Sequence, residues 1–219
     1  MHKSIKNLED INSEISVKVK ENIYPTIIAV SKTFKIPDLL PLIEYGHIHF
    51  GENKVQEALE KWKDLKIKYP KINLHLIGRL QTNKVKLAVK LFDYIHSVDS
   101  EKLAKKIYEE QLKQKKIIKV FIQVNFENEE QKSGISIKNL ENFYKYCKEL
   151  NLEVIGLMCI PPQLKNPKSF FQEMNLLKKK LDLKELSMGM TSDYIEAVEN
   201  DSTFLRIGSK IFGERKTKS

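Results

Sequence analysis

Short apolar segments alternate with longer amphipathic segments along almost the whole chain. Runs rich in β-branched and aromatic residues predict buried strands at residues 26–31, 47–51, 73–78, 93–98, 119–126, 154–160, 185–190 and 203–208. The segments between them place apolar residues three and four positions apart, which predicts helices such as those over 54–69, 101–114, 137–150 and 168–181. Strands that alternate with helices are typical of parallel sheets built from βα units.

Eight such units without a gap predict a (β/α)8 TIM barrel, with an open doubly wound sheet as the competing architecture. The segment 209–219 after the last strand is too short for a full outer helix, whereas an amphipathic helix is expected at about 3–22, before the first strand. We expect this extra N-terminal helix to cover the gap between the last and first units. Residues 1–219 should form a single domain, because no linker or low-complexity stretch divides them.

Composition and charge narrow the functional classes. The formal net charge is +9, but the lysines are scattered and mixed with glutamates, and no nucleic-acid-binding motif accompanies them. A solvated basic surface is therefore expected, with no nucleic acid partner. The sequence contains neither a secretory signal nor an apolar stretch of roughly 20 residues, so we expect a cytoplasmic protein without a membrane partner.

The cysteines and histidines give no sign of a metal site. Cys147 and Cys159 lack the close spacing of thiolate ligands and are expected to be small core residues. His47, His49 and His96 fall in predicted strands without ligand-like spacing, so we expect core or rim positions for them. The sequence leaves the roles of His75 and Arg79 open.

Chemically competent side chains gather at the predicted C-terminal ends of the strands, where TIM barrels carry their active sites. Lys32 ends the first strand, and a lysine partly desolvated there and near other cations would have a lowered pKa and could attack a carbonyl. The loops after the seventh and eighth strands, SMGMTSDY and RIGSKIFG, are rich in Gly, Ser and Thr, which suits an anion such as phosphate. An aldehyde and a phosphate on one ligand indicate pyridoxal 5′-phosphate (PLP). Arg206 would face the same side of its strand as Gly208 and could meet the pyridine nitrogen of PLP.

The sequence also resembles a known family, the PLP homeostasis proteins of YggS/PROSC type. The resemblance covers residues 27–215 and rests, in chain order, on AVSKT, FGENKVQEA, LHLIGRLQTNK, NFENEEQKSG, GLMCIPP, SMGMTSDYIEAV and STFLRIGSKIFGER. It implies an alanine-racemase-like (fold-type III) barrel that holds PLP as a Schiff base on Lys32. Thr191 stands where this family usually has serine, and it keeps the hydroxyl. Together with Ser187 at the end of the seventh strand, the expected cofactor-binding residues are Lys32, Asn53, Ser187, Thr191, Arg206, Gly208 and Ser209.

The expected function is PLP binding in intracellular PLP homeostasis and supply, without strong catalytic turnover. Arg206 opposite the ring nitrogen would disfavour its protonation and so weaken carbanion chemistry. Racemases with this barrel take a tyrosine from an additional β-domain, for which a chain ending at Ser219 leaves no room. The expected partners are PLP and PLP-dependent apo-enzymes, and a monomer is expected. The alternatives are a PLP-dependent amino-acid racemase or lyase, and a cofactor-free Schiff-base aldolase that uses Lys32.

Overall fold

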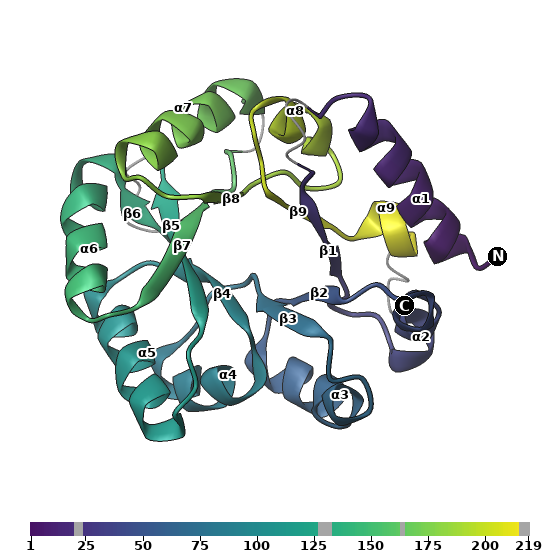
Figure 1. The fold of residues 1–219 in the computed structure, drawn as a ribbon, viewed down its shortest axis with the longest axis horizontal. Helices are drawn as coiled ribbons and strands as arrows, with labels where there is room; N and C mark the ends of the chain where they lie inside the picture. Colours follow the sequence, from purple (N-terminus) through teal and green to yellow (C-terminus); the bar gives the residue numbers. More distant parts are fainter. Residues whose placement is uncertain (20–23, 127–132, 163–164, 215–219) are drawn as a thin grey trace.

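The computed structural model describes residues 1–19, 24–126, 133–162 and 165–214. Its centre is a closed barrel of parallel strands, seen end-on in Figure 1. The barrel strands are β1 (Thr26–Val30), β2 (His49–Glu52), β3 (Asn73–Leu76), β4 (Tyr94–Val98), β5 (Lys119–Asn125), β7 (Glu153–Met158), β8 (Glu185–Ser187) and β9 (Phe204–Ile207). They follow the order β4-β3-β2-β1-β9-β8-β7-β5, and the pairing of β4 with β5 closes the barrel. A further short strand, β6 (Ile135–Ser136), pairs with β5.

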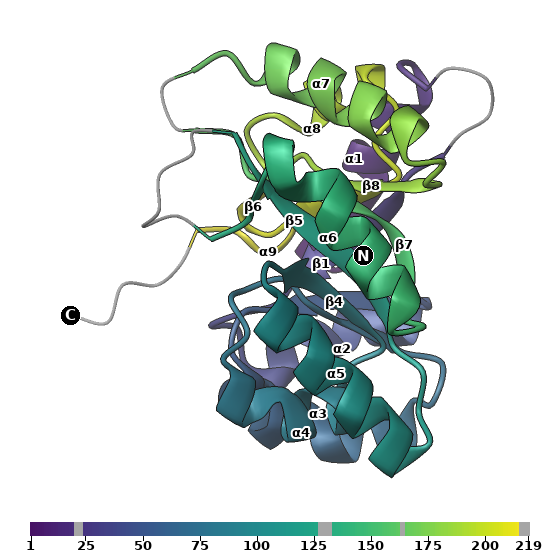
Figure 2. The same ribbon diagram turned by 90° about the vertical axis from the view of Figure 1, so that its left-hand side faces the viewer.

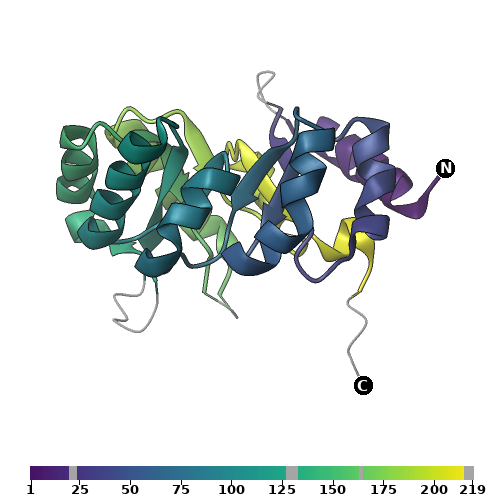
Figure 3. The same cartoon turned by 90° about the horizontal axis from the view of Figure 1, so that it is seen from below.

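Helices surround the barrel on its outside, as the two side views show (Figures 2 and 3). They are α1 (Lys3–Ser16), α2 (Ile36–Tyr45), α3 (Val55–Lys68), α4 (Val85–Leu91), α5 (Glu101–Gln114), α6 (Ile137–Glu149), α7 (Pro167–Lys180), α8 (Tyr194–Glu199) and α9 (Ser209–Phe212), with a 3-10 turn, η1 (Thr82–Lys84), before α4. None of these described helices has the length and apolar character needed to cross a membrane.

The hydrophobic core has two parts. One lies between the barrel and the helices, where the rings of Phe50 on β2 and Trp62 on α3 pack with centroids 5.0 Å apart. The other fills the inside of the barrel with side chains of Ile28, Tyr94, Phe121, Met158 and Phe204. Because side chains alternate along a strand, the inward position of Ile28 places Val30 and Lys32 on the same inner face, nearer the C-terminal end.

The predicted (β/α)8 barrel is confirmed, and every predicted strand is present with ends that differ by up to three residues. The N-terminal helix ends at Ser16 rather than at residue 22. Two β-branched valines directly after Ser16, in the sequence VKV, weaken helix propensity there. As expected, this helix packs beside the short α9 and α2, between the last and first units (Figures 1 and 3). Most of the segment ENEEQKSG and the last basic residues, including Arg215, lie outside the described residues.

Candidate functional site

A cavity of about 530 Å³ lies at the C-terminal ends of the strands. It is lined by Val30, Lys32, Phe34, Asn53, Ile77, Ile160, Met190, Thr191, Ser192, Arg206, Gly208, Ser209 and Gly213. Every predicted site residue except Ser187 is among them. The barrel therefore brings together side chains from segments that are far apart in the sequence.

The backbone just before Lys32 is held firmly in place. The Ser31 hydroxyl donates to Glu52 Oε1 over 2.7 Å, and the Ser31 carbonyl accepts from Lys61 Nζ over 2.8 Å. Directly after the lysine, Thr33 has a φ of 70°, so the chain turns sharply away from the strand. Lys32 itself is half-buried and lines the cavity. A fixed backbone on one side and a turn on the other define where the amine can reach.

Glu52 anchors this arrangement and was missed as a structural residue by the sequence reasoning. Its side chain is fully buried at the end of β2, and one carboxylate oxygen accepts hydrogen bonds from Ser31, Lys61 and Trp62. Lys61 Nζ lies 2.8 Å from that oxygen, so the buried negative charge is paired. A buried charge that is paired and hydrogen-bonded ties α3 to the ends of β1 and β2.

Two hydroxyl groups that line the cavity contact each other. Ser209 Oγ donates to Thr191 Oγ1 over 3.4 Å, which joins the loop after β8 to the start of α9. The N–H groups in the first turn of a helix have no partner within that helix. The Thr191 and Ser209 hydroxyls, with Gly208 at the start of α9, therefore lie on one side of the cavity.

The loop that carries Thr191 has a constrained shape. Gly189 adopts a φ of +90°, and a Cβ there would come within 2.6 Å of the Ala197 Cβ. Asp193 Oδ1 accepts a hydrogen bond of 2.6 Å from the Met190 backbone N–H. The SMGMTSD sequence therefore encodes a tight turn that presents Thr191 to the cavity.

Arg206 lies on β9 and extends into the cavity from the barrel interior. Its side chain is only 4% exposed, yet it lines the cavity floor. Nη1 donates to the carbonyl oxygen and the hydroxyl of Ser187 over 2.6 and 2.7 Å, and Nη2 donates to the Cys159 carbonyl over 2.8 Å. Burial lowers the pKa of the guanidinium from its very high ordinary value, while the nearby Asp193 carboxylate opposes that shift. These bonds fix the plane of the guanidinium.

The structure places Ser187 behind Arg206 instead of at the cavity surface. The serine is fully buried, its hydroxyl accepts from Arg206, and the same oxygen lies 2.8 Å from His96 Nδ1. The sequence correctly predicted its position at the end of β8, but its side chain is directed to the barrel interior. Ser187 therefore supports a site residue and does not line the cavity itself.

Asn53, Arg79 and His75 occupy three different environments. Asn53 lines the cavity, and a Cβ on Gly78 would lie 2.3 Å from the Asn53 carbonyl oxygen, so only glycine permits this close packing. Arg79 lies in a neighbouring hollow of about 350 Å³ together with Lys54. His75 is fully buried inside the barrel.

Apolar side chains form the part of the cavity wall that sequence reasoning missed. Val30 lies at the end of β1, Ile77 directly follows β3, and Phe34, Ile160 and Met190 come from the loops. Val30 could have been predicted from the sequence, because side chains alternate along a strand and Val30 lies two residues before Lys32. No sequence pattern marked the loop residues as part of the cavity wall. Apolar walls with a few convergent polar groups are typical of sites for small molecules. A lysine, an arginine and paired hydroxyls around such walls suit a ring that bears a carbonyl, a ring nitrogen and a phosphate.

The fold and the cavity together define a barrel of the alanine racemase type, and residues 6–216 match the family described as "Alanine racemase, N-terminal domain". A pyridoxal phosphate homeostasis protein from Aquifex aeolicus is 39% identical over 203 residues, which cover 87% of each chain. The chain belongs to the family of pyridoxal phosphate homeostasis proteins, as the sequence motifs predicted.

Solved structures agree with this assignment. PipY of Synechococcus elongatus PCC7942, solved without PLP, superposes with a TM-score of 0.87 at 31% identity and covers 97% of this chain and 100% of its own. The same protein with PLP bound gives a TM-score of 0.83 at 30% identity, covering 96% of this chain and 100% of its own.

Proposed function

We propose that this chain binds PLP in the cavity at the C-terminal end of the barrel and acts in PLP homeostasis without strong catalytic turnover. The observation that carries the proposal is that one cavity brings together Lys32, Arg206, Thr191 and Ser209. The names of the relatives and the PLP bound to PipY support it. As a carrier, the protein would supply PLP-dependent apo-enzymes in the cytoplasm.

Each lining residue has a distinct role in this proposal. PLP, when bound, supplies an aldehyde that condenses with an amine to a Schiff base and releases water. Lys32 provides that amine from the end of β1. Thr191 and Ser209, with the backbone N–H groups beside them, bind the phosphate. Asn53 and the apolar wall face the ring.

Arg206 favours a carrier over a racemase or lyase. Its guanidinium is fixed by hydrogen bonds to Ser187 and Cys159, so it would present a cation to the ring nitrogen. A cation at that position disfavours a second positive charge on the ring. A ring nitrogen without a proton makes PLP a weak electron sink, so Arg206 restrains carbanion chemistry.

The direct test is the variant Lys32→Ala, with Lys84→Ala as the matched control. Lys84 lines the hollow next to the cavity and is another lysine close to the site. We expect Lys32→Ala to lose the visible absorbance of bound PLP while its circular dichroism spectrum stays native, because its role is covalent. Borohydride reduction followed by peptide mass spectrometry should place PLP on Lys32 in the wild type and in Lys84→Ala. Covalent PLP retained at the wild-type level in Lys32→Ala would show that another lysine is the anchor.

A further inference from the structure

Three histidines and a serine form a continuous line of polar contacts through the barrel interior. His49 Nδ1 lies 3.0 Å from His75 Nε2, and His75 Nδ1 lies 3.0 Å from His96 Nε2. His96 Nδ1 lies 2.8 Å from Ser187 Oγ, the oxygen to which Arg206 donates over 2.7 Å. We call His49, His75, His96 and Ser187 the histidine column. It runs from the N-terminal end of the barrel, where β2 begins, to the floor of the cavity.

Aromatic neighbours hold the two inner rings in place. His75 stacks on Tyr94 with ring centroids 4.2 Å apart and an interplanar angle of 13°. His96 stacks on Phe121 at 4.2 Å and 20°. Both histidines are fully buried. In the part of the chain that the structure describes, no group of His, Cys, Asp or Glu side chains is arranged to hold a metal ion. The contacts are therefore best explained by hydrogen bonds between neutral rings.

Arg206 determines the direction of these hydrogen bonds. A guanidinium only donates, so Ser187 Oγ must accept from it. The hydroxyl has one hydrogen, and in this buried position it is satisfied if it donates to His96 Nδ1. His96 then carries its hydrogen on Nε2 and donates to His75, which donates in turn from its own Nε2 to His49. Each donor in the column therefore points away from Arg206.

The protonation behaviour expected of the inner rings agrees with this arrangement. Burial lowers the pKa of His75 and His96 well below the ordinary value for histidine. The neighbouring His96 lowers the pKa of His75 further, and Arg206 does the same to His96. Each inner ring is thus neutral and has one hydrogen to donate.

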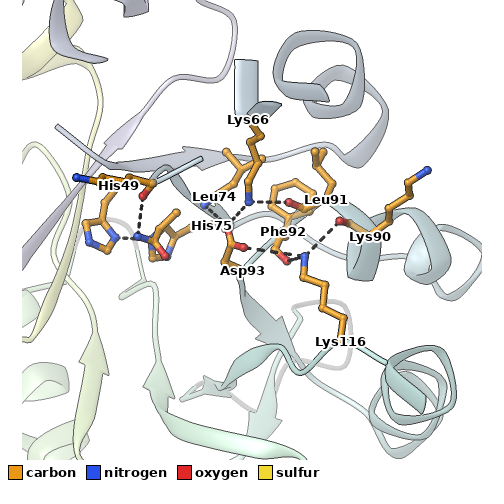
Figure 4. A network of polar contacts seen from close by, with 11 residues as sticks. His49, Lys66, Leu74, His75, Lys90, Leu91, Phe92, Asp93 and Lys116 are labelled. Carbon is orange, nitrogen blue, oxygen red and sulfur yellow. Dashed lines mark hydrogen bonds and ion pairs between the residues drawn. The ribbon is translucent and has the colours of Figure 1, made fainter. Parts of the chain in front are cut away.

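The outer end of the column is the place where it can exchange protons with solvent. His49 is only half-buried, and Figure 4 shows it beside His75 and near Asp93. Burial lowers the pKa of His49, and the Asp93 carboxylate acts in the opposite direction. Lys66 of α3 pairs with Asp93 over 2.5 Å. Lys116 lies 4.0 Å from the same carboxylate.

The remaining neighbours of His49 are aromatic or cationic. His47 lies two residues before β2, and its ring contacts the His49 carbonyl oxygen over 2.9 Å. From β4, the Tyr94 ring lies 6.5 Å away, and Lys119 of β5 sits over that ring. Asp93 is thus the acidic group that acts on His49, and its charge is shared with the two lysines that it pairs with.

We propose that the histidine column is a one-directional chain of hydrogen bonds that positions Arg206 at the cavity floor and couples its position to the protonation of His49 at the opposite end of the barrel. His49, His75, His96 and Ser187 are positioning residues in this scheme. If PLP binds as proposed, the contact between its ring nitrogen and Arg206 should respond to the protonation of His49. This consequence rests on the proposed function. The column itself does not.

The coupling follows from the hydrogen count. Protonation of His49 places a hydrogen on Nδ1, the atom that accepts from His75, so two N–H groups would face each other unless the whole column reverses. After reversal Ser187 Oγ accepts from both His96 and Arg206, and its own buried hydrogen loses its acceptor. The change adds one proton in all, leaves the positive charge on His49 and keeps Ser187 a neutral hydroxyl. The column therefore opposes protonation of His49, and protonated His49 weakens the arrangement around Arg206 to the same extent.

The direction of the column can be measured in the protein without PLP. Long-range ¹H–¹⁵N correlation spectra of the imidazole rings distinguish Nδ1–H from Nε2–H tautomers. We expect His75 and His96 to be neutral Nε2–H tautomers at pH 7. An Nδ1–H tautomer at either residue would reverse the assigned direction and overturn the proposal.

The coupling is tested with Ser187→Ala, which removes a hydroxyl three hydrogen bonds away from His49. The substitution changes no charge, so direct electrostatic effects alone would leave the pKa of His49 unchanged. We expect the His49 pKa to rise by roughly one unit, because no buried hydroxyl then opposes reversal. The matched control is Ser202→Ala. Ser202 is equally buried, but its hydroxyl contacts backbone carbonyls outside the column, so its loss should leave the His49 pKa unchanged.

A second variant keeps the test decisive if Ser187→Ala does not fold. His96→Phe retains a ring to stack on Phe121 but cuts the column, and it should also raise the His49 pKa. An unchanged His49 pKa in the folded variants would overturn the coupling. In the wild type with PLP, the visible absorbance should then shift with the His49 titration. If no PLP binds, the proposed function fails while the tautomer and titration results still decide the column.

Discussion

At the level of single residues, the proposed phosphate ligands Thr191 and Ser209 would give the cavity a means to select phosphorylated ligands. The two oxygens lie 3.4 Å apart on segments that meet only in the folded barrel. Hydrogen bonds to a charged phosphate are each worth about 1.5–3 kcal/mol. A ligand without the phosphate loses several of them.

We therefore expect pyridoxal to bind at least a hundredfold more weakly than PLP, since about 2.7 kcal/mol corresponds to that ratio. The double variant Thr191→Val, Ser209→Ala should bring the two affinities closer together by weakening PLP alone. Fluorescence titration with each ligand gives both constants. Ser13→Ala, an exposed serine on α1, serves as the control. Equal affinity of the wild type for pyridoxal and PLP would remove the phosphate-binding role from these residues.

At the level of elements, helix α1 links the N-terminal segment to the site. Glu14 of α1 pairs with Lys210 of α9 over 2.8 Å, and the Tyr194 hydroxyl of α8 contacts both side chains. Lys210 follows Ser209, one of the proposed phosphate ligands. The packing of α1 against α8 and α9 therefore also supports the segment that carries this proposed phosphate ligand.

The variant Ile11→Ala tests the contribution of this packing. Ile11 is fully buried on α1, and truncation of a buried isoleucine typically costs about 2–5 kcal/mol. We expect a lower free energy of unfolding in urea and weaker PLP binding, because α1 packs against α9. Ile67→Ala is the matched control, since Ile67 is 79% exposed on α3 and should change stability by less than about 0.5 kcal/mol. If the variant loses stability but binds PLP as tightly as the wild type, α1 does not contribute to PLP binding.

The elements also show what the sequence could and could not predict. Long periodic segments such as α5 and the β-branched runs of β1 and β5 were predictable because local pattern and burial agree. Lys32, Thr191 and Arg206 could be placed because each lies at a strand end or in the following loop. The column of His49, His75 and His96 could not. Its residues come from three strands, and only the register of the closed barrel puts their rings in line.

At the level of the whole molecule, the two ends of the barrel have different chemistry. The C-terminal end carries the cavity with Lys32 and the hydroxyls, whereas the N-terminal end carries Asp93 with Lys66 and Lys116 around it (Figure 4). Inside the barrel, an apolar cluster that includes Ile28, Phe121 and Met158 surrounds the polar side chains that lead to Arg206. In the proposed site, the environment of the PLP ring nitrogen would therefore be set by Arg206 and the groups behind it, and these would disfavour protonation of the ring.

The choice between carrier and racemase depends on this environment. If Arg206 keeps the ring nitrogen unprotonated, L-alanine added to the PLP-loaded protein should not exchange its α-proton with deuterium oxide at an enzymatic rate. Proton NMR of alanine in deuterated buffer measures the exchange, with free PLP at the same concentration as the reference and Lys32→Ala as the protein control. We expect exchange in the wild type to stay close to that of free PLP. Exchange many orders of magnitude faster, and lost in Lys32→Ala, would mean that Lys32 and a second group form a working acid–base pair, and a racemase would replace the carrier.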